Sequence, residues 1–329
     1  MTNQLLTTPI PGQLLLDKAE IVLRIPRKLA KPIYKKISKN WEQFNTKPRS
    51  VIPERHRYQY GYTVEVLEGH TIEVYTVPIG NGQSSIKIAF NPSQNAVSKL
   101  SPDTARQRIK AVRRYLKLIL GERAYTIFGK AHFTRYDLAY DYVGVNLRDF
   151  HYYMKGPHGD NTAVDDIGEV VSYKIGANSS NYQVVYYNKS LDLFKKTGNA
   201  MWLETPITRV EFRIKKNLPF REIFTIDNPF ERLTTFRFNH RDPSFQHNFI
   251  ESASTNQHIR SRLIELLDEH TLFMVLRLSE GKVGAILNSL APYRVHMYPT
   301  GLEWQKQRDN ALSPLKLFRP SKKHSQKNK

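Results

Sequence analysis

The chain has 329 residues, of which 40% are hydrophobic and 11% aromatic, so it can bury a core and is not a disordered protein. Its formal net charge of +20 favours a polyanionic partner, nucleic acid before an anionic membrane surface. The absence of cysteine excludes disulfides, thiolate zinc sites and a cysteine nucleophile. No apolar run reaches the roughly 18 residues of a membrane-spanning helix. Residues 1–12 lack a signal peptide, and we expect a cytoplasmic protein.

The N-terminal stretch is strongly basic. Residues 13–50 are expected to be helical, with seven Lys or Arg and no acid between Arg24 and Trp41. Pro26 and Pro32 are expected to divide this stretch into short pieces. The sequence therefore predicts a basic helical segment over residues 1–54.

Residues 58–90 alternate between apolar and polar side chains in the way that strands do. The expected strands are Tyr60–Val66, Thr71–Val77 and Ser85–Phe90, separated by turns at Glu68-Gly69 and Gly80–Gly82. This pattern predicts an antiparallel meander.

A helix is expected from Pro102 to Leu120, with Ser101 as its N-cap. Apolar residues form one stripe along it. A second stripe, about a quarter turn away, is basic and consists of Arg106, Lys110, Arg113 and Lys117. One side of this helix is thus suited to packing on a sheet and the other to binding an anion such as a DNA backbone.

The remaining elements complete an α+β pattern. We expect strands at 131–143, 169–176, 181–188 and 207–215, a helix near 147–155, a loop at 156–167, and a helix and turn at 189–200. Further helices are expected at 219–224, 257–268 and 270–290, before a basic tail over 316–329. The prediction is an α+β fold: a central antiparallel sheet of about five or more strands with helices on its faces, then a mainly helical C-terminal region.

Two aspartates lie on one face of the strand at 131–143. Side chains alternate along a strand, so Asp137 and Asp141 share a face with the small Ala139 between them. Two like charges on one face repel unless a cation lies between them, and Mg²⁺ or Mn²⁺ prefers such oxygen ligands. The alternative is that both aspartates face water on a half-exposed strand.

The strand at 207–215 carries a matching pattern. Arg209, Glu211 and Arg213 share one face. These residues read either as a solvated face with cross-strand ion pairs or as a third metal ligand, Glu211, beside cations that hold phosphates.

A tyrosine on the strand at 181–188 is the candidate nucleophile. Alternation places Tyr187 on the opposite face from Tyr186, and Lys189 lies two residues later on the same side if the strand continues. A phenol with a pKa of about 10 is a weak nucleophile until a cation or base assists it. Most strand tyrosines only pack, so the carboxylates and cations on the neighbouring strands are what favour catalysis.

The order of these motifs resembles a known family. Residues 55–216 carry Arg135–Asp141, Tyr187-Asn188-Lys189 and Arg209–Arg213 in the order found in the Rep_trans family of rolling-circle replication initiators. The resemblance implies an HUH-like endonuclease core that nicks origin DNA through tyrosine, leaving a 5′-phosphotyrosine and a free 3′-OH, and later rejoins the ends.

The resemblance also assigns roles to individual residues. It implies Tyr187 as nucleophile with Lys189 beside it, Asp137 and Glu211 as ligands of Mg²⁺ or Mn²⁺, and Asp141 as a further ligand. DNA contacts are expected from the helix cations and from Arg135, Arg209 and Arg213. The expected partners are origin DNA, a host helicase and a second copy of the chain, and no membrane.

The resemblance covers residues 55–216, which we expect to be the catalytic domain. From composition and pattern we expect a basic helical segment over 1–54, a mainly helical accessory region over 217–315 and a disordered tail over 316–329. No His-apolar-His motif is present, unlike in typical HUH nucleases. Conjugative relaxases and gene II type filamentous-phage proteins share the chemistry and are not distinguished.

Other classes of function remain open. A non-catalytic protein that binds single-stranded nucleic acid would use the tyrosines for stacking. A metal-dependent nuclease that uses water would need the acids without Tyr187. A tyrosine recombinase is disfavoured, because its tyrosine is helical and C-terminal.

Overall fold

The computed structural model describes residues 11–39, 47–48, 58–79, 84–94, 102–146, 150–155, 160–164, 170–177, 179–238 and 283–318. The chain divides into two compact units. The first, here called the basic unit, comprises Gln13–Ala139, Arg213–Asp227 and Leu302–Lys329. The second, the tyrosine unit, comprises Met1–Gly12, Tyr140–Phe212 and Asn228–Gly301. Each unit therefore combines distant stretches, whereas the sequence suggested consecutive segments.

The basic unit is built on an antiparallel sheet. Its strands are β1 (Leu15–Arg24), β2 (Lys47–Pro48), β3 (Tyr58–Leu67), β4 (His70–Pro78), β5 (Ser85–Phe90), β6 (His132–Val143) and β12 (Leu218–Pro219). They run in the order β2-β3-β4-β5-β1-β6, with β12 also on β6. The meander predicted from the alternation of residues 58–90 is confirmed.

The start of the basic segment is a strand, which corrects the prediction of a helix over residues 13–50. Ala19, Ile21 and Leu23 occur at every second position and are buried. Ile21 pairs with Ile88 of β5 on one side and with Phe133 of β6 on the other. The period of two was present in the sequence, but the basic residues that follow it drew the assignment towards a helix. The helix α1 begins only after Pro26, at Arg27, and ends at Lys39.

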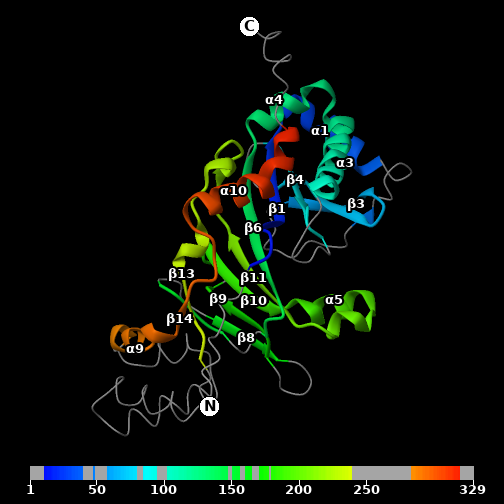
Figure 1. The fold of residues 1–329 in the computed structure, drawn as a ribbon. Coiled ribbons are helices and arrows are strands. Elements are labelled where there is room, and N and C mark those ends of the chain that lie inside the picture. The colour runs from blue at the N-terminus through cyan, green and yellow to red at the C-terminus, as the bar shows by residue number, and fades with distance from the viewer. Residues whose placement is uncertain are drawn as a thin grey trace. The chain divides into compact units, whose positions relative to one another are not determined.

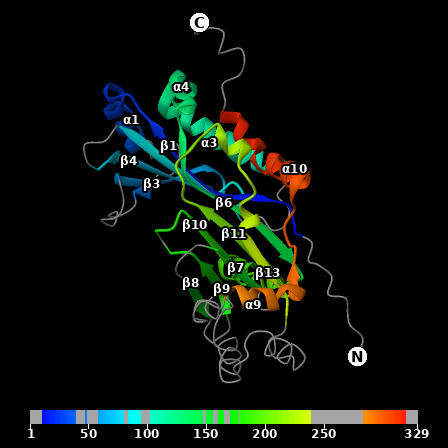
Figure 2. The ribbon, with the colours of Figure 1, turned by 90° about the vertical axis from the view of Figure 1, so that its left-hand side faces the viewer.

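Helices and aromatic rings complete the basic unit. Its helices are α1, α3 (Pro102–Leu120), η1 (Gly121–Arg123), α4 (Ala124–Gly129), η4 (Glu222–Thr225), α10 (Gly301–Leu312) and η7 (Ser313–Phe318). The last of these contacts α3, so the end of the described chain lies against a helix from its first half (Figure 2). Phe318 stacks on Phe128 at 4.5 Å between ring centroids, which anchors η7 in the core.

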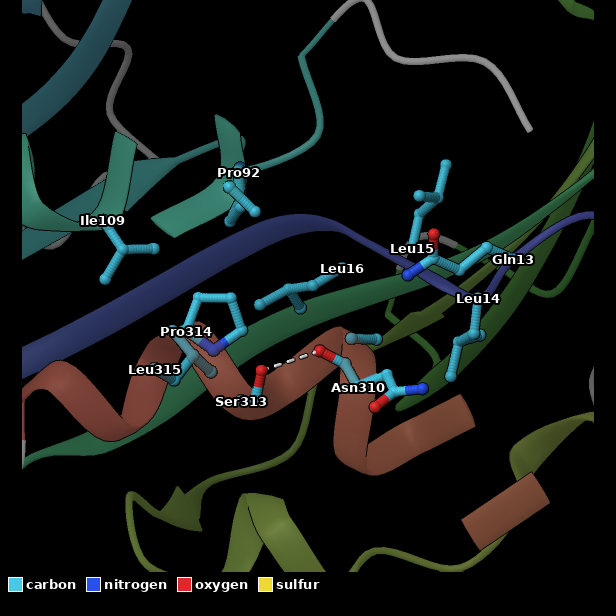
Figure 3. A pocket seen from close by; sticks show the side chains of 12 residues that line it. Gln13, Leu14, Leu15, Leu16, Pro92, Ile109, Asn310, Ser313, Pro314 and Leu315 are labelled. Atoms are coloured by element: carbon cyan, nitrogen blue, oxygen red, sulfur yellow. Dashed lines mark hydrogen bonds between the residues drawn. The ribbon is translucent and has the colours of Figure 1, made fainter. Parts of the chain in front are cut away.

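A cavity of about 190 Å³ lies in this unit. Figure 3 shows its wall of leucines from the start of β1, facing Asn310 and Pro314. The Ser313 hydroxyl donates a hydrogen bond to the main-chain oxygen of Asn310 at 3.1 Å. No acidic, basic or histidine side chain lines the cavity, so it offers no group for acid–base chemistry.

The tyrosine unit contains two sheets. Its elements are β7 (His151–Met154), β8 (Asp160–Val164), β9 (Val170–Ile175), β10 (Tyr182–Asn188), α5 (Lys189–Thr197), η3 (Ala200–Leu203), β11 (Ile207–Ile214), η5 (Pro229–Arg232), β13 (Leu233–Phe236), α9 (Val283–Ser289), η6 (Ala291–Tyr293) and β14 (Arg294–Val295). The larger sheet continues from the end of β6 in the order β6-β11-β10-β9-β8, and the smaller is β14-β13-β7. Figure 1 shows α5 leaving the end of β10.

Two local predictions in this unit were wrong. The helix expected near 147–155 is the strand β7, in which Tyr152 and Met154 are buried and Tyr152 pairs with Thr235 of β13. The expected loop at 156–167 contains β8, which pairs with β9. Both strands are held by distant partners that a local reading of the sequence does not reveal. The predicted helix 257–268, most of 270–290 and the tail beyond Phe318 lie outside the described residues; α9 falls at the end of that second helix.

A glycine shapes the connection into β10. Gly176 follows β9 with φ of +101°, and a Cβ there would lie 2.7 Å from the main-chain oxygen of Tyr182. The Gln183 amide donates to the oxygens of Gly176 and Ala177. This close approach needs a residue without a side chain and fixes the start of the strand that carries Tyr187.

These elements confirm the predicted α+β class, with antiparallel pairing wherever the strand register is given. None of the helices in the described part of the chain is long and apolar enough to cross a membrane.

Candidate active site around Tyr187

The two adjacent tyrosines of β10 have different environments. Tyr187 is partly exposed, whereas Tyr186 is fully buried. The ring of Tyr186 stacks on Tyr152 with centroids 3.5 Å apart, and burial raises its pKa well above the usual value. Tyr186 is therefore a core residue. Tyr187 is the one of the pair that a substrate can reach, as alternation along the strand predicted.

Lys189 lies directly beside Tyr187. Asn188 ends β10 and caps α5, its side-chain oxygen accepting a hydrogen bond from the amide of Leu191 at 3.0 Å. This turn makes Lys189 the first residue of the helix and directs its side chain back over the strand. Its Nζ is 5.7 Å from the centre of the Tyr187 ring. The predicted pair is thus brought together by the helix cap.

The ammonium of Lys189 is buried and paired with a carboxylate. Only 4% of the Lys189 side chain is exposed, and its Nζ donates to Oδ2 of Asp192 at 2.6 Å. Burial lowers the pKa of Lys189, and the positive charge of Arg209 lowers it further, while Asp192 opposes both effects. Lys196, which is half exposed, donates to the same carboxylate at 2.9 Å.

Arg209 and Asp141 form a fully buried ion pair in the same unit. Nε of Arg209 donates to Oδ1 of Asp141 at 2.6 Å, and its terminal nitrogen donates to Oδ2 at 2.8 Å. The exposed fractions of the two side chains are 1% and 0%. This two-point geometry satisfies both charges in the interior.

This pairing changes what Arg209 and Asp141 can do. The guanidinium of Arg209 holds the carboxylate and does not reach the surface, so the DNA contact predicted for it is not offered by this structure. The reading in which the aspartates face water is excluded, because Asp137 and Asp141 are both buried. Glu211, on the same strand as Arg209, is buried as well.

Asp137 has a separate arginine partner in the basic unit. Arg135 binds it at two points, with Nε 2.9 Å from Oδ1. Burial raises the pKa of Asp137, although the hydrogen bonds and charge of Arg135, and then the charge of Arg213, oppose this. Arg135 therefore neutralises a buried carboxylate, while Arg213 remains partly exposed.

The donor set for a divalent ion is incomplete in this arrangement. Within the described residues, no group of three His, Cys, Asp or Glu side chains lies close enough together to hold a metal ion. Asp137 and Asp141 are each occupied by a guanidinium, which an ion would have to displace. These two residues as placed do not fit as metal ligands, and the Mg²⁺ or Mn²⁺ site stays a prediction.

The basic stripe of α3 faces outwards as expected. Arg106, Lys110 and Lys117 are exposed, and Arg113 is partly exposed. The apolar stripe of the same helix, which includes Ile109 and Leu116, is buried.

Sequence reasoning missed Asp192. The signal was available, since Lys189, Asp192 and Lys196 are spaced three and four residues apart, as in helical ion pairs. It was overlooked because this segment was read only as a connection after the tyrosine strand.

Comparison with known proteins gives a structural likeness but no family. No family model matches the chain, and no curated protein matches it. A solved structure described as a rolling circle replication initiator protein from Geobacillus stearothermophilus is 13% identical, with a TM-score of 0.34. The alignment covers 64% of this chain and 77% of that one. We therefore argue the function from the side chains of this chain.

Proposed function

We propose that this chain is a DNA nicking and joining enzyme of the rolling-circle initiator type, with Tyr187 as its nucleophile. The observation that carries the proposal is the pairing of a partly exposed tyrosine with a buried lysine whose Nζ is 5.7 Å from its ring. A lysine buried beside a strand tyrosine needs a reason, because burial of a charge costs free energy.

The reaction exchanges one ester for another. The phenol oxygen of Tyr187 attacks the phosphorus of a DNA phosphodiester, and the 3′ oxygen leaves and takes up a proton. The products are a 5′-phosphotyrosine and a free 3′-OH. Because the ester bond is conserved, attack by a 3′-OH on the phosphotyrosine reverses the step and rejoins the ends without ATP.

Lys189 supplies the charge that this step requires. As a cation it favours the phenolate of Tyr187 and the negative charge that develops on the phosphate. Asp192 raises the pKa of the amine against burial and Arg209, and holds the amine in place. Asp137 and Asp141 are held by arginines, and Mg²⁺ or Mn²⁺ would polarise the phosphate if bound.

The test is formation of a covalent adduct. The protein is mixed with the supercoiled replicon that carries its gene, or with labelled single strands from it, and the denatured protein is examined for retained label. Tyr187→Phe is expected to abolish the adduct. Tyr186→Phe is the matched control, since it makes the same change at the neighbouring buried position.

The result that contradicts the proposal is an adduct that persists in Tyr187→Phe. Nicks without any adduct would instead indicate hydrolysis by water. A conjugative relaxase would give the same adduct on transfer-origin DNA. Recruitment of a host helicase and assembly of a dimer belong to the same proposal.

A further inference from the structure

Two basic helices of the basic unit lie against each other. The Lys36 ammonium of α1 donates a hydrogen bond to the main-chain oxygen of Leu118, near the C-terminal end of α3. The two helices are also in contact, and they are seen next to each other in Figure 1. A cation at a helix C-terminus is favoured by the helix dipole, so this contact helps fix α1 on α3.

The outward side of α1 is dominated by basic residues, with Pro32 also exposed on it. Ala30, Ile33 and Ile37 are buried, which fixes the side that faces the protein. The helix contains no acidic residue. Its exposed cations are Arg27, Lys28, Lys31, Lys35, Lys36 and Lys39.

The outward side of α3 continues this charge. Ile109, Val112 and Leu116 are buried on its opposite side. Its exposed cations are Arg106, Lys110, Arg114 and Lys117. We call the exposed cations of the two helices the α1–α3 basic surface.

Neither aromatic side chain on these helices is fully exposed, although Tyr34 is only partly buried. The Tyr34 hydroxyl of α1 donates to the main-chain oxygen of Ser85 at 3.1 Å, and Tyr115 of α3 is fully buried. Binding of single strands usually depends on stacking of bases on exposed rings. A surface of cations without such rings suits the regular backbone of a duplex, which places one charge at about every 1.7 Å of axis.

We propose that the α1–α3 basic surface binds the sugar–phosphate backbone of double-stranded DNA without regard to sequence. This goes beyond the nicking function, because it assigns binding of double-stranded DNA to residues of the basic unit, none of which belongs to the Tyr187 site. The charge complementarity is direct: ten exposed cations on two adjacent helices face outwards.

The experiment measures binding of a fluorescent duplex and of an oligo-dT strand of equal length over a series of salt concentrations. The test variant is Lys31→Gln/Lys35→Gln/Lys110→Gln. The control is Lys130→Gln/Lys216→Gln/Lys306→Gln, which removes the same charge at exposed positions elsewhere. Circular dichroism confirms that both variants are folded.

The test variant is expected to bind duplex more weakly, with the slope of log K against log salt reduced by about 3. The control is expected to keep the wild-type slope, and oligo-dT binding is expected to fall less than duplex binding. An equal loss in the control, or an unchanged slope in the test variant, would overturn the proposal. So would an equal loss of oligo-dT binding. Adduct formation is scored separately with Tyr187→Phe, so each conclusion can fail alone.

Discussion

The Lys189 ammonium lies 2.6 Å from Oδ2 of Asp192 and 5.7 Å from the centre of the Tyr187 ring. The lysine thus connects a partly exposed phenol to a carboxylate that is itself shared with Lys196. Without Asp192, burial and the nearby charge of Arg209 would act on the lysine unopposed. The carboxylate is what makes a cation at this buried position chemically useful.

Asp192→Asn is therefore expected to shift the pH dependence of adduct formation. Burial and then Arg209 lower the pKa of Lys189, and Asp192 opposes them, so its removal lowers this pKa further. The lysine then loses its proton at a lower pH, and the alkaline limb of the pH–rate profile moves to lower pH. Lys196→Gln removes a cation that slightly lowers the pKa of Lys189, so it should move that limb, if at all, to higher pH. If the rate of adduct formation falls at every pH while the alkaline limb stays in place, Asp192 has only a structural role.

The same pKa shift makes a prediction for stability. The pKa of Lys189 in the folded protein is below its unfolded value of about 10.4, so the charged amine opposes folding at neutral pH. This cost disappears as pH rises from the folded pKa to the unfolded one. The free energy of unfolding of the wild type should therefore rise between these two pKa values, and Lys189→Met is expected to abolish this rise. Urea unfolding of both proteins at several alkaline pH values measures it; parallel curves would contradict the expectation.

Removing Arg209 is expected to destabilise the protein strongly. Arg209→Met removes both guanidinium hydrogen bonds from the buried carboxylate of Asp141, which costs about 3–5 kcal/mol. The double variant Arg209→Met/Asp141→Leu should recover much of this, since no charge then remains. Chemical denaturation measures both changes. A loss below about 1 kcal/mol in the single variant, the range of an exposed ion pair, would mean that water reaches the pair.

The Arg209–Asp141 ion pair also determines which acidic residues should affect the metal dependence of adduct formation. If the role of Asp141 is to pair with Arg209 and not to bind a metal ion, Asp141→Asn should lower the free energy of unfolding. It should leave the Mn²⁺ concentration for half-maximal adduct formation unchanged. If Glu211 binds the ion, Glu211→Gln should raise that concentration, and a chelator should abolish the adduct until Mg²⁺ or Mn²⁺ is restored. Full adduct formation in the chelator would contradict the predicted metal requirement.

The sequence predicted the tyrosine strand and the basic face of α3 because both depend on local periodicity. Alternation along the strand correctly predicted that Tyr186 and Tyr187 lie on opposite faces, the first buried and the second partly exposed. The alternation pattern did not reveal that Arg209 forms an ion pair with Asp141, because the two residues are 68 positions apart in the chain. Strand β7 was missed for the same reason, since its partner β13 is also distant in the chain. Local patterns determine which face a side chain occupies, and tertiary pairing determines which charge it meets.

A substitution at Gly176 tests how the tyrosine strand is positioned. Gly176→Ala places a methyl group 2.7 Å from the main-chain oxygen of Tyr182, at a φ of +101° that alanine rarely adopts. The expected cost is about 1–3 kcal/mol in unfolding free energy, because backbone atoms must move. Gly129→Ala is the control, since open space surrounds its Cβ and its φ is not positive. Denaturant unfolding should separate the two variants, and adduct formation should fall only in the first. Equal stabilities would show that the connection from β9 to β10 adapts without moving Tyr187.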